Sequence, residues 1–229
     1  MRLLILLLTL FICCATLTPK APSSINLEMI KTDGFSPLKT LDRKEILFLK
    51  SGNKGGIALI FSSESKAFVE LGLEGVEGLS YKFYPPSFNL KAHGRKACLL
   101  KFSPDRSLSS LYLSPSLIVE AHGSRTIYPL PPLLVSESKP SFLLRGGGEV
   151  LKLKKGEEAN ILLITKGEAK ISSVPLGIEA VLTPSPVRVI PEGKASNLLV
   201  KAPEDAVPWL YEIKIKAEEE ITLVVEVLE

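Results

Sequence analysis

An internal repeat constrains this chain more than any other feature of its sequence. Shifting the sequence by 104 positions aligns residues 45–61 on residues 149–165 without a gap, with eight identities in seventeen positions. A shift of 99 positions aligns residues 78–112 on residues 177–211, with eight further identities. The two blocks keep the same order, and a loop between them can absorb the change of offset. The repeat therefore predicts a tandem duplication, in which one fold occurs twice.

Each copy contains short apolar runs with the residue types of β-strands, such as Gly56–Phe61 and Ile221–Leu228. Turn signals recur about every eight to twelve residues, and no stretch of either copy keeps the 3.6-residue period of a helix. About seven strands per copy is the number found in an immunoglobulin-like (Ig-like) sandwich. The sequence thus predicts an all-β protein of two tandem Ig-like antiparallel β-sandwiches, over residues 25–137 and 138–229, with Pro129–Pro132 as a stiff bridge.

The first residues have the pattern of a secretory signal peptide, which we place at residues 1–15. Arg2 precedes an apolar block that is too short to cross a membrane comfortably as a helix. Residues 16–24 are then a linker. A lipid anchor on Cys13 or Cys14 is the alternative to simple cleavage. Because no second apolar span follows, we expect an exported protein of the cell surface or exterior, without a transmembrane helix in its mature chain.

Charge and composition bear on the partner and on the environment. The chain carries 28 Lys and Arg against 25 Asp and Glu, and its basic residues form no cluster. We therefore expect no binding of nucleic acid. The sequence contains no glutamine and five asparagines. Depletion of these thermolabile amides beside abundant Lys and Glu is the composition expected of a protein from a thermophile.

Three aromatic residues near the end of the second aligned block are candidates for special roles. Tyr112 and Tyr211 occupy the same alignment position. We interpret both as tyrosine corners, in which the ring lies at the edge of the core and the hydroxyl bonds to the backbone upstream. Trp209 is expected near a loop, where its ring either packs on the rim of the sandwich or contacts a partner.

The second copy also resembles a known family of domains. Pro186–Gly193, Leu198–Asp205 and Leu210–Ala217 contain a proline-bearing strand, an x-Gly turn, a strand ending in Ala-Pro, and a tyrosine that opens the penultimate strand. In these features the chain is similar to the surface Ig-like modules of archaea and bacteria, including those attached to alpha-galactosidases. The Gly-x-Tyr of that family is here Trp209-Leu-Tyr211. The resemblance implies a scaffold and no particular chemistry.

Residues 16–40 have no counterpart in the repeat. Ile25, Leu27 and Met29 alternate with polar residues, which is the pattern of a half-buried strand. This segment is either an extra first strand of copy one or a donor strand that leaves its own subunit. A donor strand would complete the sandwich of the next subunit through main-chain hydrogen bonds.

No set of residues in the sequence has the spacing of a catalytic or metal-binding site. His93 and His122 each precede a glycine and are expected in turns, while Cys98 alternates with apolar residues as a small buried residue does. Arg145–Glu149 is expected as a flexible entry to copy two, and Glu218–Glu220 as a solvated turn. We therefore predict no enzymatic activity, no catalytic residue, no cofactor and no bound metal.

These expectations favour a non-enzymatic, exported cell-surface protein that acts as a structural or protein-interaction module. Its partner is then another protein or its own subunits. Three alternatives stay open. The chain could be a filament subunit assembled by donor-strand exchange, a two-Ig-domain assembly chaperone, or an accessory carbohydrate-binding module that uses Trp209.

Overall fold

The computed structural model describes residues 25–38, 40–41, 46–104, 110–146, 149–191 and 193–229. The predicted signal peptide and linker, with Cys13 and Cys14, lie outside these ranges. Within them the regular structure consists of β-strands, so the chain is all-β, as predicted. No stretch of the described chain forms a helix long and apolar enough to cross a membrane.

Copy one is a sandwich of two four-stranded sheets. Their strand orders are β1-β4-β8-β6 and β11-β10-β5-β7, and all pairs within them are antiparallel. The bounds are β1 Ile25–Lys31, β4 Gly55–Ser63, β5 Ala67–Glu74, β6 Ser80–Tyr84, β7 Ser87–Leu90, β8 Gly94–Ser103, β10 Ser116–Ala121 and β11 Ser124–Pro129. Alternate side chains of these strands point inward and form one core between the sheets.

Copy two is a second sandwich with its own core. Its sheets have the orders β13-β15-β19-β17 and β14-β21-β20-β16. The bounds are β13 Phe142–Leu144, β14 Glu149–Lys154, β15 Glu158–Thr165, β16 Lys170–Ser173, β17 Glu179–Pro184, β19 Lys194–Lys201, β20 Leu210–Lys216 and β21 Glu220–Leu228. The first sheet has the A-B-E-D order of an Ig-like sandwich, and β16, β20 and β21 take the places of strands C, F and G.

Most strands of the two copies correspond, although β1 runs antiparallel to β4 whereas β13 runs parallel to β15. At the shift of 104, β4 falls on β15, and at the shift of 99, β6 falls on β17. The change of offset coincides with β5, which spans eight residues where its counterpart β16 spans four. The structure therefore contains two copies of one Ig-like fold.

Prolines split the last two strands of copy one. Pro115 separates β10 from β9 (Leu111–Leu113), and Pro131-Pro132 separates β11 from β12 (Leu133–Ser136). A proline has no N–H to donate to the sheet ladder. The two interruptions lie side by side, so β9 and β12 leave the sandwich together. The corresponding strands of copy two, β20 and β21, are continuous.

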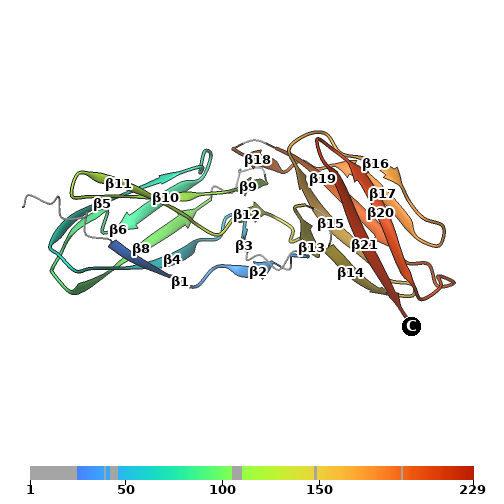
Figure 1. Cartoon of the computed structure of the whole chain (residues 1–229), viewed down its shortest axis with the longest axis horizontal. Helices are drawn as coiled ribbons and strands as arrows, with labels where there is room; N and C mark the ends of the chain where they lie inside the picture. The colour runs from blue at the N-terminus through green and yellow to red at the C-terminus, as the bar shows by residue number, and fades with distance from the viewer. Residues whose placement is uncertain (1–24, 39, 42–45, 105–109, 147–148, 192) are drawn as a thin grey trace, which may run out of the picture.

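Beyond these prolines, β9 and β12 enter a third sheet that lies between the two copies (Figure 1). Its order is β18-β9-β12-β3-β2, with β2 at Ser36–Leu38, β3 at Ile46–Lys50 and β18 at Arg188–Ile190. We call it the junction sheet. Four of its strands belong to copy one, whereas β18 belongs to copy two and pairs in parallel with β9. A strand of the second copy thus completes a sheet of the first.

The junction sheet packs against the outer face of β13, β15 and β19, and the contact forms a third apolar cluster. We call this the joint cluster; its buried members are Leu38, Ile46, Phe48, Tyr112, Leu134, Leu143, Leu162, Ile164 and Ala195. Hydrophobic packing therefore fixes the copies to each other. The prediction that Pro129–Pro132 bridges them is wrong, because this segment joins β11 to β12 within copy one.

Candidate partner-binding surfaces

Tyr211 lies at the start of β20, which takes the place of strand F. Its hydroxyl donates a hydrogen bond to the Val207 carbonyl oxygen, 2.8 Å away and four residues upstream. Its ring packs against the core of copy two. Gly177, at a φ of +93°, lies beside this ring, and a Cβ there would come within 3.1 Å of the Tyr211 hydroxyl. This is the geometry of a tyrosine corner, and it brings two loops together at one end of copy two.

Tyr112 has a different place from Tyr211. Its neighbours Leu111 and Leu113 point into the core of copy one. The Tyr112 ring therefore points to the opposite face, where it is 1% exposed within the joint cluster. The two strands differ by one residue from the sequence alignment, and such a slip moves every side chain to the other face of a sheet. Tyr112 is thus a residue of the joint rather than a corner at the edge of its own core.

Trp209 belongs to an apolar group at the end of copy two where β20 begins and β21 finishes. The Trp209 side chain is 71% exposed, and Val207 and Leu210 beside it are 65% and 57% exposed. Leu176 precedes Gly177, which contacts the Tyr211 ring, and the Leu176 side chain is 97% exposed. We call these four residues the tip. Apolar side chains gathered in water are typical of binding surfaces. The role of Trp209 in partner contact stays a prediction.

A second surface, not expected from the sequence, is a hollow of about 830 Å³ over the outer face of the β11-β10-β5-β7 sheet. Phe68 of β5 lines it and is 53% exposed. The turn at His122-Gly123 and charged residues of both signs complete the lining. The sequence held one signal for this site: Phe68 stands among Glu70, Gly72 and Glu74 on the polar side of its strand.

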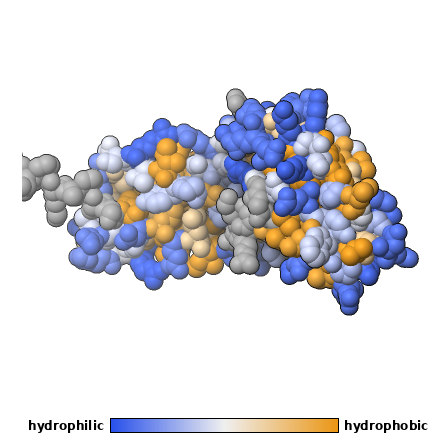
Figure 2. Space-filling view, turned by 45° about the vertical axis from the view of Figure 1, so that its right-hand side comes forward, coloured by the Kyte–Doolittle hydropathy of each residue, from blue (hydrophilic) through white to orange (hydrophobic). Residues whose placement is uncertain are grey.

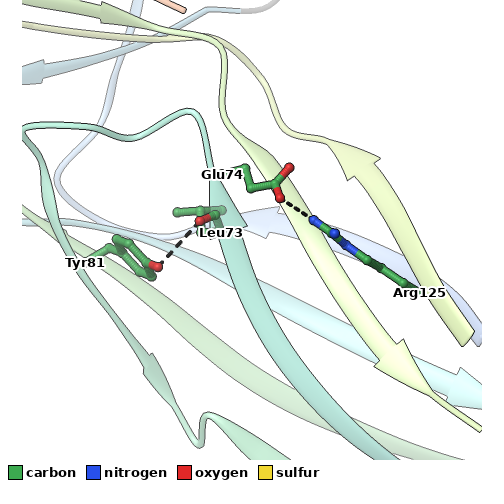
Figure 3. Close-up of polar contacts among 4 residues, drawn as sticks. All are labelled: Leu73, Glu74, Tyr81 and Arg125. Atoms are coloured by element: carbon green, nitrogen blue, oxygen red, sulfur yellow. Dashed lines mark hydrogen bonds and ion pairs between the residues drawn. The ribbon is translucent and has the colours of Figure 1, made fainter. Parts of the chain in front are cut away.

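Ion pairing fixes the border of this hollow. Arg125 of β11, which lines the hollow, forms an ion pair with Glu74 of β5 across the intervening strand β10 (Figure 3). The Tyr81 hydroxyl of β6 donates to the Leu73 carbonyl oxygen of β5 at 3.5 Å and links the two sheets of copy one. The hollow therefore presents one exposed aromatic ring among charged side chains of both signs.

The residues considered for chemistry are spread over the molecule. His93 and His122 lie on turns, as expected, at positive φ of 55° and 53°. Cys98 is buried in β8, where its thiol donates to the Pro85 carbonyl oxygen at 3.1 Å and burial raises its pKa. Among the described residues, no group of three or more His, Cys, Asp and Glu side chains is placed to hold a metal ion.

Two loop predictions have different outcomes. The Glu218–Glu220 run forms the turn between β20 and β21, closed by a hydrogen bond from the Ala217 amide to the Glu219 carbonyl. The Arg145–Glu149 run leads from β13 into β14, but residues 147–148 lie outside the described residues.

The N-terminal strand β1 pairs with β4 of its own copy along its whole length, from Ile25 opposite Ser63 to Lys31 opposite Ile57. Ile25 and Leu27 pack against the core of copy one, whereas Met29 is 41% exposed. In this chain the segment is therefore an extra first strand of copy one, at the edge of a sheet. The donor-strand alternative stays a prediction.

Tyr128 of β11 ties β1 to the opposite sheet, and this contact predicts a pH dependence. Its hydroxyl donates to the Ile25 carbonyl oxygen at 2.8 Å, and burial raises its pKa above the ordinary value of about 10. The folded chain then holds this proton more tightly than the unfolded chain. The stabilisation is complete below pH 10 and is lost as the pH rises through the raised pKa. We expect the free energy of unfolding to fall above about pH 10.

Urea unfolding across this pH range measures the effect in the full chain and in Tyr128→Phe, whose free energy of unfolding should fall less steeply. Tyr84→Phe, at a tyrosine 48% exposed, is the matched control and should keep the original slope. Equal slopes for the original chain and Tyr128→Phe would contradict the prediction.

No family model and no curated protein matches this sequence. Solved structures similar to it include the E. coli chaperone DraB, at 10% identity and a TM-score of 0.33, covering 89% of this chain and 98% of that one. A complex of the Salmonella enterica SafA pilin with the SafB chaperone has 9% identity, coverage of 89% and 97%, and a TM-score of 0.34. A Porphyromonas gingivalis W83 protein of unknown function has 12% identity and a TM-score of 0.33, and the match covers 87% of this chain and 99% of that one. Such remote similarity assigns no function.

Proposed function

We propose that this chain is an exported, non-enzymatic cell-surface protein that acts as a structural or protein-interaction module. The observation that carries the proposal is the tip. Burying apolar surface is worth about 25 cal/mol per Å², yet the chain leaves Leu176, Trp209 and Leu210 in water although both of its cores are filled. Tryptophan is one of the residue types enriched in the hot spots of protein-binding surfaces.

Two further observations support the proposal. The pattern of residues 1–15 favours export. The likeness of residues 186–217 to surface Ig-like modules of archaea and bacteria favours a scaffold over a catalyst. The joint adds a mechanical argument, because a buried apolar contact between the copies holds the tip in a fixed direction relative to copy one.

Photo-crosslinking in the cells that make the protein tests the proposal. With a photoreactive amino acid in place of Trp209, irradiation should join the chain to a protein partner. Lys216, exposed at the far end of β20, is the matched control position and should give far fewer adducts. Protease added to intact cells should digest the chain. Equal yields at both positions, or full protection from the protease, would count against this function.

A filament subunit assembled by donor-strand exchange is the second candidate, and the edge position of β1 favours it. An edge strand can pair with a neighbouring chain without breaking the middle of a sheet. Deleting residues 16–31 should then abolish polymerisation. Polymers that persist after the deletion would exclude this route.

A further inference from the structure

The outer face of the β1-β4-β8-β6 sheet in copy one is apolar in its middle. A row crosses all four strands, because Ile30 lies opposite Ala58, Ala58 opposite Leu99 and Leu99 opposite Tyr84. Ile30 and Tyr84 are 46% and 48% exposed. Figure 2 shows orange side chains in the middle of the copy-one half, between blue margins. We call this surface the open face; its members are Ile30, Ala58, Ile60, Tyr84, Ala97 and Leu99.

The same face of copy two is covered. Leu143 pairs with Leu162 at the place where Ile30 pairs with Ala58, although β13 runs parallel to its neighbour and β1 antiparallel. Ile60 pairs with Ala97 as Ile164 pairs with Ala195. The four residues of copy two are all buried in the joint cluster, under the junction sheet of copy one. This fold therefore uses the face to dock on the end of another sandwich, and copy one carries the same face without such a cover among the described residues.

The other side of the joint also has an exposed counterpart. Tyr112 of β9 lies in the joint cluster, and the next residue, Leu113, points into the core of copy one. In copy two Leu210 occupies the position that corresponds to Tyr112, because the next residue, Tyr211, packs on the core of copy two. Val150 aligns with Ile46 at the shift of 104, and the Val150 side chain is 45% exposed. Each chain thus keeps one unused docking face in copy one and one unused docking end in copy two.

We propose that the tip binds the open face of a second copy of this chain, in a head-to-tail contact that resembles the internal joint. This inference rests on the proposed function, because it names the partner of the same tip. Contacts between two different surfaces are heterologous and continue from chain to chain, as a ring or an open filament.

Lysines at the open face and carboxylates around the tip have opposite charges, while Glu28 and Arg95 beside the open face neutralise each other in an ion pair at 2.8 Å. Lys82 and Lys101 lie at the margin of the open face, with their ammonium groups 5.6 Å and 5.4 Å from the centre of the Tyr84 ring. Around the tip, Glu204, Asp205 and Glu212 are exposed. Opposite charges at the rims favour this orientation and steer the encounter of two chains.

One difference from the internal joint sets the expected strength. Phe48 pairs with Leu134 in the junction sheet, and at the corresponding places in copy two Lys152 pairs with Glu226. Their side chains form an ion pair at 2.8 Å. Because this hydrated pair replaces two apolar side chains, the contact between chains is weaker than the joint within a chain. We therefore expect reversible, concentration-dependent association.

Sedimentation velocity on the chain from residue 16 onward, from about 1 μM to about 1 mM, tests the proposal. We expect a monomer at the low end and chains of several copies at the high end. Ile60→Glu removes the open face and Trp209→Glu removes the tip, so each variant alone should remain monomeric. Their equimolar mixture should form a dimer and nothing larger, because each variant keeps one working surface. Ile127→Glu, at a residue 54% exposed on the other sheet, is the matched control and should assemble normally.

Circular dichroism checks that each variant folds, and Tyr84→Glu replaces Ile60→Glu if the latter does not. A monomer at every concentration overturns the inference. So does association that survives Trp209→Glu, since an open-face dimer or donor-strand exchange would then explain it, and so does a mixture that fails to dimerise. A monomeric chain that still cross-links another protein through position 209 would overturn this inference and leave the proposed function standing.

Discussion

Tyr112→Ala is expected to lower the free energy of unfolding of the whole chain by about 3–5 kcal/mol, the usual cost of removing a large buried aromatic side chain. Tyr112 is among the largest fully buried side chains. Its ring packs among residues of both copies, and its backbone pairs with Val189 of copy two. The cost should therefore fall on both copies, in contrast to an ordinary core substitution within one sandwich.

Urea unfolding of the full chain measures this effect. Trp209 is the single tryptophan of the sequence and lies in copy two, so its fluorescence reports on that copy, while circular dichroism reports on all strands. Both transitions should move to lower urea in Tyr112→Ala. Tyr211→Phe is the control at the aligned position, and losing its one hydrogen bond should cost about 1 kcal/mol. A Tyr112→Ala transition that moves by circular dichroism alone would show that the joint does not couple the copies.

Copy two, expressed alone as residues 138–229, is expected to fold and to self-associate strongly. The buried residues of its core all belong to copy two, with Leu41 of copy one packed only at the margin, and the segment is above the size at which small domains depend on disulfides. Isolation, however, uncovers Leu143, Leu162 and Ile164 and leaves β18 without its partner strand. An apolar patch on the flat face of a sheet drives association in water.

Equilibrium unfolding and sedimentation of this segment are the measurements. The double variant Leu162→Lys and Ile164→Lys is the matched control, because it makes the uncovered face polar without touching the core, and it should be monomeric. An unfolded segment would show that the second sandwich depends on the first for its structure. A segment that is monomeric without the substitutions would show that the uncovered face is not a docking surface.

The sequence predicts the parts of this fold that depend on local patterns. Strand alternation, glycine turns and the repeat lead to two Ig-like sandwiches, because the period of a half-buried strand is visible in the residues themselves. The buried thiol of Cys98 and the turns at His93 and His122 follow from the same patterns. Trp209 stood out by its type and its place near a loop, and it is exposed.

The joint was not predictable in the same way. The Arg188–Ile190 strand is recognisable between its prolines, but nothing in its residues says that its partner belongs to the other copy. The alignment likewise pairs Tyr112 with Tyr211, while one position of slip between the strands sends the two rings to opposite faces. The open face was not predictable for a related reason. Its role as a docking surface is inferred from the junction sheet that covers the corresponding face of copy two.

Because β18 pairs with β9, the junction sheet cannot be completed during translation until β18 has been synthesised. The copy-one strands of the junction sheet have all been synthesised once residue 136 is added, but β18 begins only at residue 188. At about 5–20 residues per second, translation of that interval takes on the order of 3–10 s. Throughout it the edge of β9 has no neighbour from copy two and Tyr112 remains in contact with water. The half of the protein that is synthesised first thus waits for a strand of the second half, and a nascent chain stalled in this interval carries an open strand edge.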